Sequence, residues 1–480
     1  MAKSVLVKRR RKAYRARNLA RWDASIEGST SLWRRISPPQ LLIGSFFLLI
    51  VAGVVGLMCL PGLYRGPRLG LTDALFTSTS AVCVTGLIVV DTATYFTPAG
   101  QAFILLLIQL GGLGMLAFTS LVIQILGFRL SLRSETLTHS ARSGSPLINL
   151  RRLTRDIVLF TFFIEGVGAG ALYLLWGPRL GWSQAWWPAI FHSVSGFCNA
   201  GFSTYSDSLI GLNSSSLTLL VLAMLIMAGG LGFVTMEEAW LKIRTRKRLE
   251  FQRLSLNSRL ILVTTLVLVV LPWPIFAAFE WNGQLKALSW GDKVCNALFL
   301  SVTPRTAGFN SLDYLHASNG TNFLTMLLMA VGGAPGSTAG GIKVTTFAII
   351  VLTAWSRWRG LGTTVFANRS IPSDTVQRAT GLVVMAAVVM ALGCFALMVT
   401  EQPNSTHNTF LQRMFEVVSA FNTVGLSLNE TPQLSTAGRW VIIVLMFLGR
   451  VGPMTMAAAL VIEHSRVGRY RFAYEDVAVG

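Results

Sequence analysis

The sequence predicts an all-α polytopic membrane protein, built from four repeats of a span, a re-entrant loop and a second span around a pseudo-fourfold axis. Three observations lead to this fold class. Hydrophobic residues make up 52% of the 480 residues, whereas charged residues make up 13%, compared with about 25% in soluble proteins. Basic residues are concentrated in every second connection between long apolar stretches. A glycine motif also recurs at a nearly constant period.

Apolar stretches long enough to cross a hydrocarbon core of about 30 Å give the expected spans. They are residues 41–60, 103–126, 157–176, 217–236, 260–279, 323–352, 379–399 and 440–462.

The charge distribution orients these spans. Of the 41 Lys and Arg residues, 31 lie in residues 1–35, 128–155, 242–259, 356–378 and 466–471. The positive-inside rule therefore predicts that both termini are cytoplasmic. We expect these segments to set topology and to contact anionic lipids. Nucleic-acid binding is the rival explanation, but the bias recurs on every cytoplasmic connection without a nucleic-acid-binding motif, so no nucleic acid is expected as a partner.

Each outer connection contains a short apolar segment, suited to a re-entrant helix, that ends in a similar motif. The motifs are CVTGL (83–87), CNAGF (198–202), RTAGF (305–309) and NTVGL (422–426), and their glycines are 115, 107 and 117 residues apart. The following spans carry glycine clusters beginning at Gly111, Gly229, Gly332 and Gly449, which lie 25, 28, 24 and 24 residues beyond the loop glycines. Helix packing explains any one cluster, and we favour it for Gly111 and Gly229 taken alone. It does not explain the shared register.

These landmarks divide the chain into repeats and linkers. We predict repeat one at 39–127, repeat two at 154–241, repeat three at 259–356 and repeat four at 378–465. The expected cytoplasmic segments are a basic tail at 1–38, linkers at 128–153, 242–258 and 357–377, and a tail at 466–480.

Four such loops can place rings of backbone carbonyls on one axis. Non-helical backbone at membrane depth must be buried in protein or line a wet cavity. Carbonyl rings replace the hydration shell of a monovalent cation, and glycine permits the backbone geometry that turns carbonyls inward. The motifs carry no carboxylate, which argues against a divalent-cation filter. Potassium is therefore the first choice of ion.

The segments STSAVCVTGL (78–87), TPRTAGFN (303–310), GGAPGSTAGGIKVTT (332–346) and FEVVSAFNTVGLS (415–427) resemble the filter and gate motifs of the Trk/Ktr/HKT superfamily of potassium transporters. The bacterial Ktr membrane subunit is the more similar type, because only a basic tail precedes the first span. The resemblance implies a potassium uptake subunit in the bacterial plasma (inner) membrane. It also implies a homodimer on a cytoplasmic nucleotide-binding regulatory ring, no resident cofactor, K⁺ as the transported ion and Na⁺ as a candidate activator.

By this resemblance, glycine at the filter position of all four repeats accompanies potassium preference, and the preceding carbonyls coordinate the ion. The expected filter residues are Val84, Thr85, Gly86, Asn199, Ala200, Gly201, Thr306, Ala307, Gly308, Thr423, Val424 and Gly425.

A run in the third repeat cannot remain regular helix, because it holds five glycines and one proline. A kink for packing is the alternative explanation. The resemblance implies an intramembrane gate loop that Lys343 helps to occlude or anchor. Its residues are Gly332, Gly333, Ala334, Pro335, Gly336, Ser337, Thr338, Ala339, Gly340 and Gly341.

Arg450 occupies the register position of Gly112, Gly230 and Gly333 in the other repeats. A lone arginine at membrane depth costs about 2.5 kcal/mol or more, so we expect it to face the cavity and repel a cation. The resemblance likewise places a gating arginine below the filter, as an electrostatic barrier. The structural alternative is that Arg450 bridges a helix carbonyl or Glu165.

Other charges within or near the spans are expected to be structural. We expect Arg305 to lie behind the filter, paired with Glu416 or Asp73. For Glu237 and Glu238 we expect a solvated or partner-facing role.

Two rival classes remain. A membrane-embedded enzyme would need a nucleophile with a base or a metal set, and no H-E-x-x-H, paired aspartates or Ser/His pairing is visible, so we expect no enzyme. The five histidines are scattered and form no metal set.

A sodium- or proton-coupled secondary transporter is the nearer rival, since broken helices and repeats occur there too. Against it, the repeats are parallel and only Glu165 could carry a proton, but sodium coupling stays open.

Overall fold

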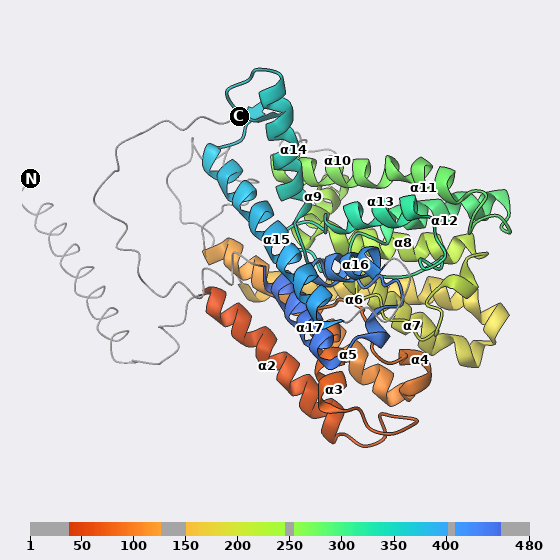
Figure 1. The fold of residues 1–480 in the computed structure, drawn as a ribbon. Helices are drawn as coiled ribbons and strands as arrows, with labels where there is room; N and C mark the ends of the chain where they lie inside the picture. Colours follow the sequence, from red (N-terminus) through yellow and green to blue (C-terminus); the bar gives the residue numbers. More distant parts are fainter. Residues whose placement is uncertain (1–37, 126–149, 245–253, 402–408, 453–480) are drawn as a thin grey trace, which may run out of the picture.

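The computed structural model describes residues 38–125, 150–244, 254–401 and 409–452, and nearly all regular structure there is helical (Figure 1). The predicted tails 1–38 and 466–480 lie outside these ranges apart from Pro38, as do residues 128–149 of the first linker and residues 245–253 of the linker 242–258. The described linker 357–377 contains a hairpin of β1 (Val365–Phe366) and β2 (Arg369–Ser370), paired antiparallel.

The helices follow one order four times: an outer helix, a short helix ending near a loop glycine, and an inner helix. The outer helices are α2 (Pro38–Cys59), α6 (Leu150–Leu180), α10 with α11 (Leu256–Val270, Pro272–Glu280) and α15 (Ser373–Thr400). The short helices are α3 (Leu71–Val82), α7 (Trp182–Cys198), α12 (Trp290–Val302) and α16 (Thr409–Phe421). The inner helices are α5 (Pro98–Ile125), α8 with α9 (Ser216–Leu231, Phe233–Arg244), α13 with α14 (Asn319–Met329, Val344–Trp358) and α17 (Thr436–Val451). Short connecting pieces are α4 (Thr92–Tyr95), η2 (Ile210–Leu212) and η4 (Thr431–Gln433).

Neighbouring repeats are joined by one recurring contact, in which an inner helix packs against the short helix of the next repeat. The pairs are α5 with α7, α8 with α12, α13 with α16, and α17 with α3. Because the last pair returns to the first repeat, the four units close into a ring.

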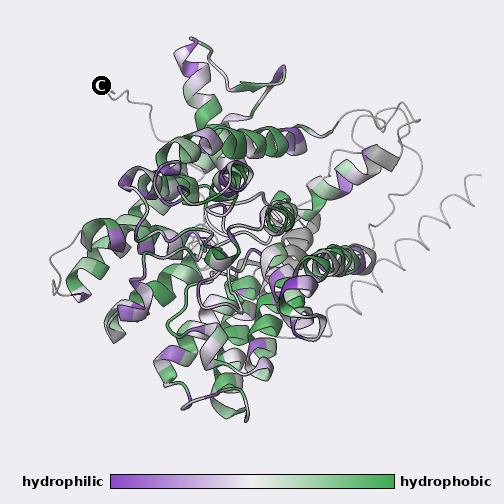
Figure 2. Ribbon diagram, turned by 90° about the vertical axis from the view of Figure 1, so that its right-hand side faces the viewer, coloured by the Kyte–Doolittle hydropathy of each residue, from purple (hydrophilic) through white to green (hydrophobic). Residues whose placement is uncertain are grey.

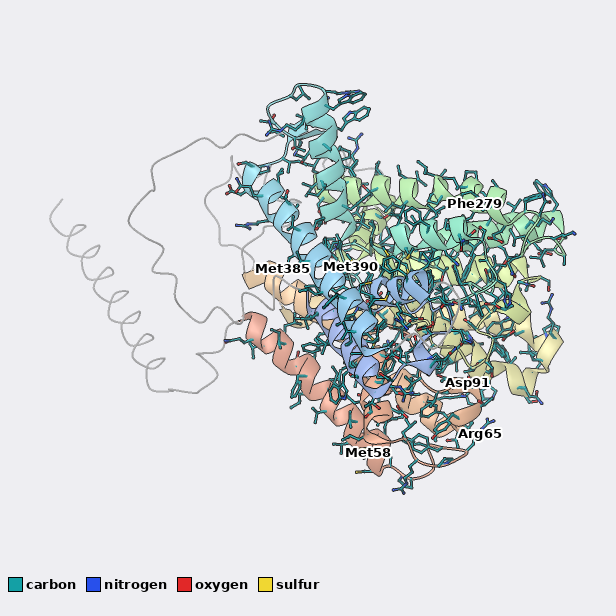
Figure 3. All side chains as sticks on the ribbon, in the orientation of Figure 1. Met58, Arg65, Asp91, Phe279, Met385 and Met390 are labelled. Carbon is teal, nitrogen blue, oxygen red and sulfur yellow. The ribbon has the colours of Figure 1, made fainter. Side chains whose placement is uncertain are left out.

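The outer helices carry the apolar surface that a bilayer requires. Each is long and apolar enough to cross a membrane, over Gln40–Cys59, Arg155–Leu180, Leu256–Glu280 and Ser373–Thr400. Large side chains on them are exposed, such as Leu48 (72%) and Phe163 (69%). The ribbon coloured by hydropathy shows hydrophobic residues in green along many of the helices (Figure 2). Met58 and Phe279, labelled in Figure 3, are further exposed side chains of this kind. A multi-pass membrane protein follows from this surface.

Two inner helices depart from the straight spans that the sequence predicts. The expected span 217–236 bends by 103° between α8 and α9, at Gly232 with φ +79°. A Cβ there would lie 2.9 Å from the Pro335 carbonyl oxygen, so the break accommodates the third repeat. The expected span 323–352 is split into α13 and α14. The intervening segment contains the glycine-rich run, which is non-helical as predicted.

Candidate functional site

The four loops share an unusual backbone. The residue two positions before each loop glycine has a left-handed φ, from 51° to 67°, at Val84, Asn199, Thr306 and Thr423. Each loop glycine also has a positive φ, at 91°, 69°, 74° and 93° for Gly86, Gly201, Gly308 and Gly425. In an extended strand successive carbonyls alternate in direction. Left-handed residues at alternate positions allow successive carbonyls to point to one side, as the filter predicted from the sequence requires.

The loop glycines bring the four loops together in one ring. A Cβ on Gly201 would lie 2.9 Å from the Ala307 carbonyl oxygen of the next loop. In the same way, Gly86 faces the Ala200 carbonyl, Gly308 the Val424 carbonyl, and Gly425 the Thr85 carbonyl. The order is that of the chain and returns to its start. Only glycine fits these positions, because any side chain would run into the neighbouring backbone.

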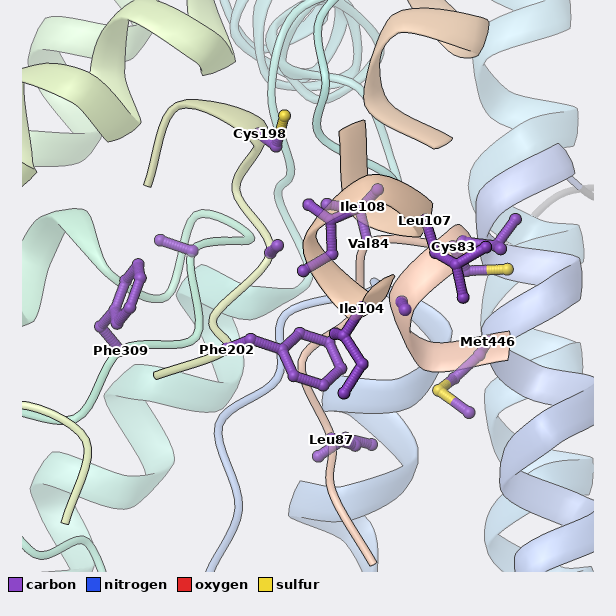
Figure 4. Close-up of a cluster of buried hydrophobic side chains, with 14 of the residues drawn as sticks. Cys83, Val84, Leu87, Ile104, Leu107, Ile108, Cys198, Phe202, Phe309 and Met446 are labelled. Atoms are coloured by element: carbon purple, nitrogen blue, oxygen red, sulfur yellow. The ribbon is translucent and has the colours of Figure 1, made fainter. Parts of the chain in front are cut away.

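All twelve predicted filter residues therefore lie in this ring of loops. Apolar side chains pack around part of this ring: Val84 and Leu87 of the first loop lie in one buried cluster with Phe202 and Phe309 of the next two (Figure 4). A tightly packed cluster of this kind resists changes in the spacing of the loops.

A set of hydroxyl groups that the sequence analysis missed holds each loop to its short helix. Ser80 Oγ donates to the Leu87 carbonyl at 2.7 Å and accepts from the Gly86 N–H at 3.1 Å. Ser195 and Thr303 donate likewise to Phe202 and Phe309, each at 2.7 Å. Ser419 accepts from the Gly425 N–H at 3.1 Å. The available signal was a Ser or Thr five or six residues before each loop glycine.

The inner-helix glycines mainly serve packing. A Cβ on Gly111, Gly229 or Gly449 would overlap the Val82, Phe197 or Phe421 carbonyl, near the end of the short helix of the same repeat. Close helix approach, the interpretation favoured for Gly111 and Gly229 taken alone, therefore explains the first glycine of three clusters.

The glycine-rich segment of repeat three lies between the inner helices. Its Ala334 N–H donates to the Gly230 carbonyl at 2.8 Å, and its Gly341 N–H donates to the Gly449 carbonyl at 3.3 Å. A Cβ on Gly340 would overlap the Thr423 side chain of the fourth loop. Lys343 Nζ donates to the Ala339 carbonyl at 2.6 Å, closing the segment on itself. The predicted gate residues thus contact both the inner helices and a filter loop.

Arg450 connects this segment to the first repeat. It is 1% exposed, and its guanidinium donates to the Thr338 carbonyl and, at 3.0 Å, to the Gly111 carbonyl. In the described part of the chain it makes no ion pair. Of the two bridging contacts considered, the carbonyl contact is observed. Glu165 instead accepts from Gln109 Nε2 at 3.1 Å.

Two expectations about charged residues are wrong. Arg305 is buried, but its guanidinium donates to Thr265 Oγ1 at 3.4 Å and not to either predicted carboxylate. The proposed partners are occupied elsewhere, because Glu416 accepts from Ser427 and Thr431 and Asp73 pairs with Arg439.

Glu238 also differs from expectation, whereas its neighbour Glu237 is exposed. Glu238 is 5% exposed and accepts from Ser255 N–H at 3.2 Å and from Ser255 Oγ at 2.9 Å. It therefore fixes the start of α10 instead of facing solvent or a partner.

Comparison with known proteins extends these observations. The model of the TrkH family, described as a cation transport protein, matches residues 44–467. The Ktr system potassium uptake protein B of Bacillus subtilis is 41% identical over 425 residues, covering 88% of this chain and 93% of the relative. The potassium/sodium uptake protein NtpJ of Enterococcus hirae is 37% identical over 451 residues, covering 93% of this chain and 98% of the relative. The crystal structure of the potassium transporter TrkH from Vibrio parahaemolyticus matches with a TM-score of 0.72 at 20% identity, covering 89% of this chain and 86% of that chain. This match supports the same fold.

Proposed function

Because this chain belongs to the TrkH family of cation transport proteins, we propose that it is the ion-translocating membrane subunit of a potassium uptake system. The observation that carries this proposal is the closed ring of four glycine loops, in which each loop glycine faces a carbonyl of the next. The names of two similar proteins, one a potassium uptake protein and the other a potassium/sodium uptake protein, support the choice of ion.

In the proposed mechanism, K⁺ is the substrate and enters the ring dehydrated. The carbonyls of the two residues before each loop glycine replace its hydration shell. The carboxyl ends of α3, α7, α12 and α16 lead into these loops. The partial negative charge of a helix carboxyl end favours a cation there.

Passage beyond the ring is controlled by the glycine-rich segment and Arg450. Three backbone N–H groups of the segment, those of Ala334, Thr338 and Gly341, donate to inner-helix carbonyls, and glycine-rich backbone rearranges with little steric resistance. The Arg450 charge makes the closed arrangement unfavourable for a cation. Opening consists of moving the segment away from Gly230 and Gly449 together with the guanidinium.

The chain acts in the bacterial plasma membrane with both termini cytoplasmic, as a homodimer on a cytoplasmic nucleotide-binding regulatory ring. The basic residues on one side support this orientation. The name of one relative refers to a Ktr system, which supports a partner of this kind. The same basic face offers a surface to anionic lipids.

Sodium-coupled potassium uptake is the second candidate. It is favoured by the similarity to a potassium/sodium uptake protein. The same ring would then carry both ions, and Na⁺ would act as co-substrate or activator.

The test is rubidium uptake into proteoliposomes containing the purified protein, competed by K⁺ or Na⁺, with and without a cytoplasmic partner. Competition by K⁺ at concentrations well below those needed for Na⁺ is expected. Equal competition by the two ions would contradict potassium selectivity. Uptake that requires Na⁺ outside would favour the coupled mechanism.

A further inference from the structure

Two buried polar side chains occupy the same register behind two of the loops. His192 lies nine residues before Gly201, and Glu416 lies nine residues before Gly425. Both side chains are 0% exposed. Each lies on its short helix opposite a serine two residues after the loop glycine, Ser203 or Ser427. The filter mechanism proposed above does not use either side chain.

In the second repeat the contact is an imidazole–hydroxyl hydrogen bond. His192 Nδ1 lies 2.8 Å from the Pro188 carbonyl oxygen, and Nε2 lies 2.9 Å from Ser203 Oγ. A carbonyl can only accept, so the hydrogen-bond network assigns the proton of the neutral ring to Nδ1 and leaves Nε2 to accept from Ser203. The Ser203 proton is shared with the Ser208 carbonyl at 3.1 Å. Ser203 Oγ in turn accepts from the Tyr205 N–H at 3.0 Å.

In the fourth repeat a carboxylate makes the equivalent contact. Glu416 accepts from Ser427 Oγ and, at 2.6 Å, from Thr431 Oγ1. Ser427 Oγ accepts from the Asn429 N–H at 3.0 Å. Asn429 and Tyr205 stand at the same distance after their loop glycines. The chain of contacts from helix side chain to serine to backbone N–H is therefore the same in both repeats.

The first and third repeats do not have this pairing. Their residues nine positions before the glycine are Thr77 and Phe299, and the residues two positions after it are Ile88 and Asn310. Because the loops contact one another in chain order, the second and fourth loops face each other across the ring. The two side-chain contacts thus form one diagonal pair.

The second-repeat contact also reaches the third loop. The His192 ring stacks on Phe309, with ring centres 6.1 Å apart and an interplanar angle of 29°. Phe309 directly follows Gly308. Displacement of His192 would therefore disturb two adjacent loops.

We propose that His192 and Glu416 are positioning residues that determine ion specificity, by holding the second and fourth loops at the separation that suits K⁺. A ring free to contract could coordinate the smaller Na⁺, and two hydrogen-bonded contacts on opposite sides restrain that contraction. The proposal rests on the proposed potassium-uptake function, since it assigns these residues to the selectivity of the same ring.

The test compares leucine and glutamine variants at both positions in proteoliposomes, measuring rubidium uptake and its competition by K⁺ and Na⁺. Glutamine retains an acceptor within reach of the serine, whereas leucine does not. Glu416→Leu and His192→Leu are expected to lower K⁺ over Na⁺ preference by about fivefold or more, the scale of the one buried hydrogen bond that connects each side chain to its loop serine. Glu416→Gln and His192→Gln are expected to stay within about twofold of wild type on the same scale. Thr77→Val, at the same register of the first loop, is the matched control and is expected to leave preference unchanged.

Variants of Ser203 and Ser427 test the hydrogen bonds that these serines make with His192 and Glu416. Ser427→Ala should reproduce the loss seen in Glu416→Leu, and the double variant should lose little more than either single variant, because both interrupt one contact. Ser427→Ala and Ser203→Ala are small changes, so they decide the question if a leucine variant fails to fold. Folded variants that transport with unchanged preference would overturn the proposal. A wild-type protein without potassium preference would instead overturn the proposed function.

Discussion

Arg450 Nη2 donates a hydrogen bond of 3.0 Å to the carbonyl of Gly111, so the inner helix of the fourth repeat is attached to that of the first. The same guanidinium donates to Thr338 in the glycine-rich segment. The buried Arg450 guanidinium therefore connects the first and fourth inner helices to the segment proposed as the gate.

Replacing Arg450 with alanine should raise the uptake rate. The substitution removes a positive charge near the proposed ion path and the hydrogen bond to the Thr338 carbonyl. An increase of about fivefold is expected, from the lower end of the roughly 1–4 kcal/mol repulsion between close charges. Initial rubidium uptake per protein measures it, with Arg450→Lys as the control that keeps the charge. Equal rates for wild type and the alanine variant would favour a purely structural role.

Substituting serine for Gly86 should reduce potassium preference. Gly86 has φ +91°, and a Cβ would overlap the Ala200 carbonyl, so the first loop must shift. A loss of about tenfold is expected, since relieving the overlap with the second loop costs roughly 1–3 kcal/mol and displaces both loops. Reversal potentials in liposomes measure the change.

Gly181→Ser is the matched control for Gly86. Gly181 has φ +85° but nothing within 4 Å of its Cβ position. It should carry a similar backbone cost without loss of selectivity. Unaltered reversal potentials in Gly86→Ser would contradict the filter assignment.

Removing three residues from the glycine-rich segment, Ser337 to Ala339, should increase flux and weaken dependence on the cytoplasmic partner. The deletion eliminates the Thr338 contacts with Gly229 and Arg450. About tenfold higher flux without partner corresponds to a shift of about 1.4 kcal/mol toward the open arrangement. Thr338→Val, which loses the hydroxyl contact with Phe197, should show a smaller increase. Flux equal to wild type would count against gating by this segment.

Alanine at Gly449 should destabilise the protein. Its Cβ would overlap the Phe421 carbonyl, whereas a Cβ on Gly114 would meet nothing within 4 Å. Overpacking costs about 1–3 kcal/mol, while alanine in an open helix position gains about 0.5–1 kcal/mol over glycine. Thermal unfolding in detergent should therefore show opposite shifts for Gly449→Ala and Gly114→Ala. A Gly449→Ala midpoint at or above that of wild type would refute the packing role.

The stabilising effect of Asp292 should disappear on acidification. Hydrogen bonds from Ser216 Oγ (2.5 Å) and Ser289 Oγ (2.7 Å) hold the pKa of Asp292 below its ordinary value. Because the native pKa is lowered, ionised Asp292 stabilises the folded state at every pH above its unfolded pKa of about 3.9. This stabilisation is lost as the pH falls through the native pKa. The difference in unfolding midpoint between wild type and Asp292→Asn should be constant near neutral pH and shrink below about pH 4. A difference that grows on acidification would contradict this linkage.

The loops could be located from sequence because their constraint acts on single residues. Gly86, Gly201, Gly308 and Gly425 combine positive φ with contact against the next loop. Only glycine satisfies both conditions, so the four positions can be recognised in the sequence as glycines at a nearly constant spacing. The break in the third inner helix could be predicted for a similar reason, because five glycines and one proline in ten residues are incompatible with a regular helix.

Partners of charged side chains could not be predicted in the same way. Charge complementarity suggested Glu416 or Asp73 for Arg305, but three-dimensional packing gives those carboxylates other contacts. The bend at Gly232 also escaped prediction, since a glycine in a membrane helix is compatible with either packing or a break. His192 and Glu416 differ in chemistry, so their shared register emerges only once both are seen to bind a serine.

The ring is closed by a single polypeptide, with Gly425 facing Thr85 as the last contact. In an assembly of four identical chains, one codon change alters every quadrant of the ion's coordination shell at once. Here a codon change alters one quadrant and leaves three intact. In the proposed filter, ion preference can therefore change one loop at a time, and selectivity can be varied experimentally by substituting one, two or three loops.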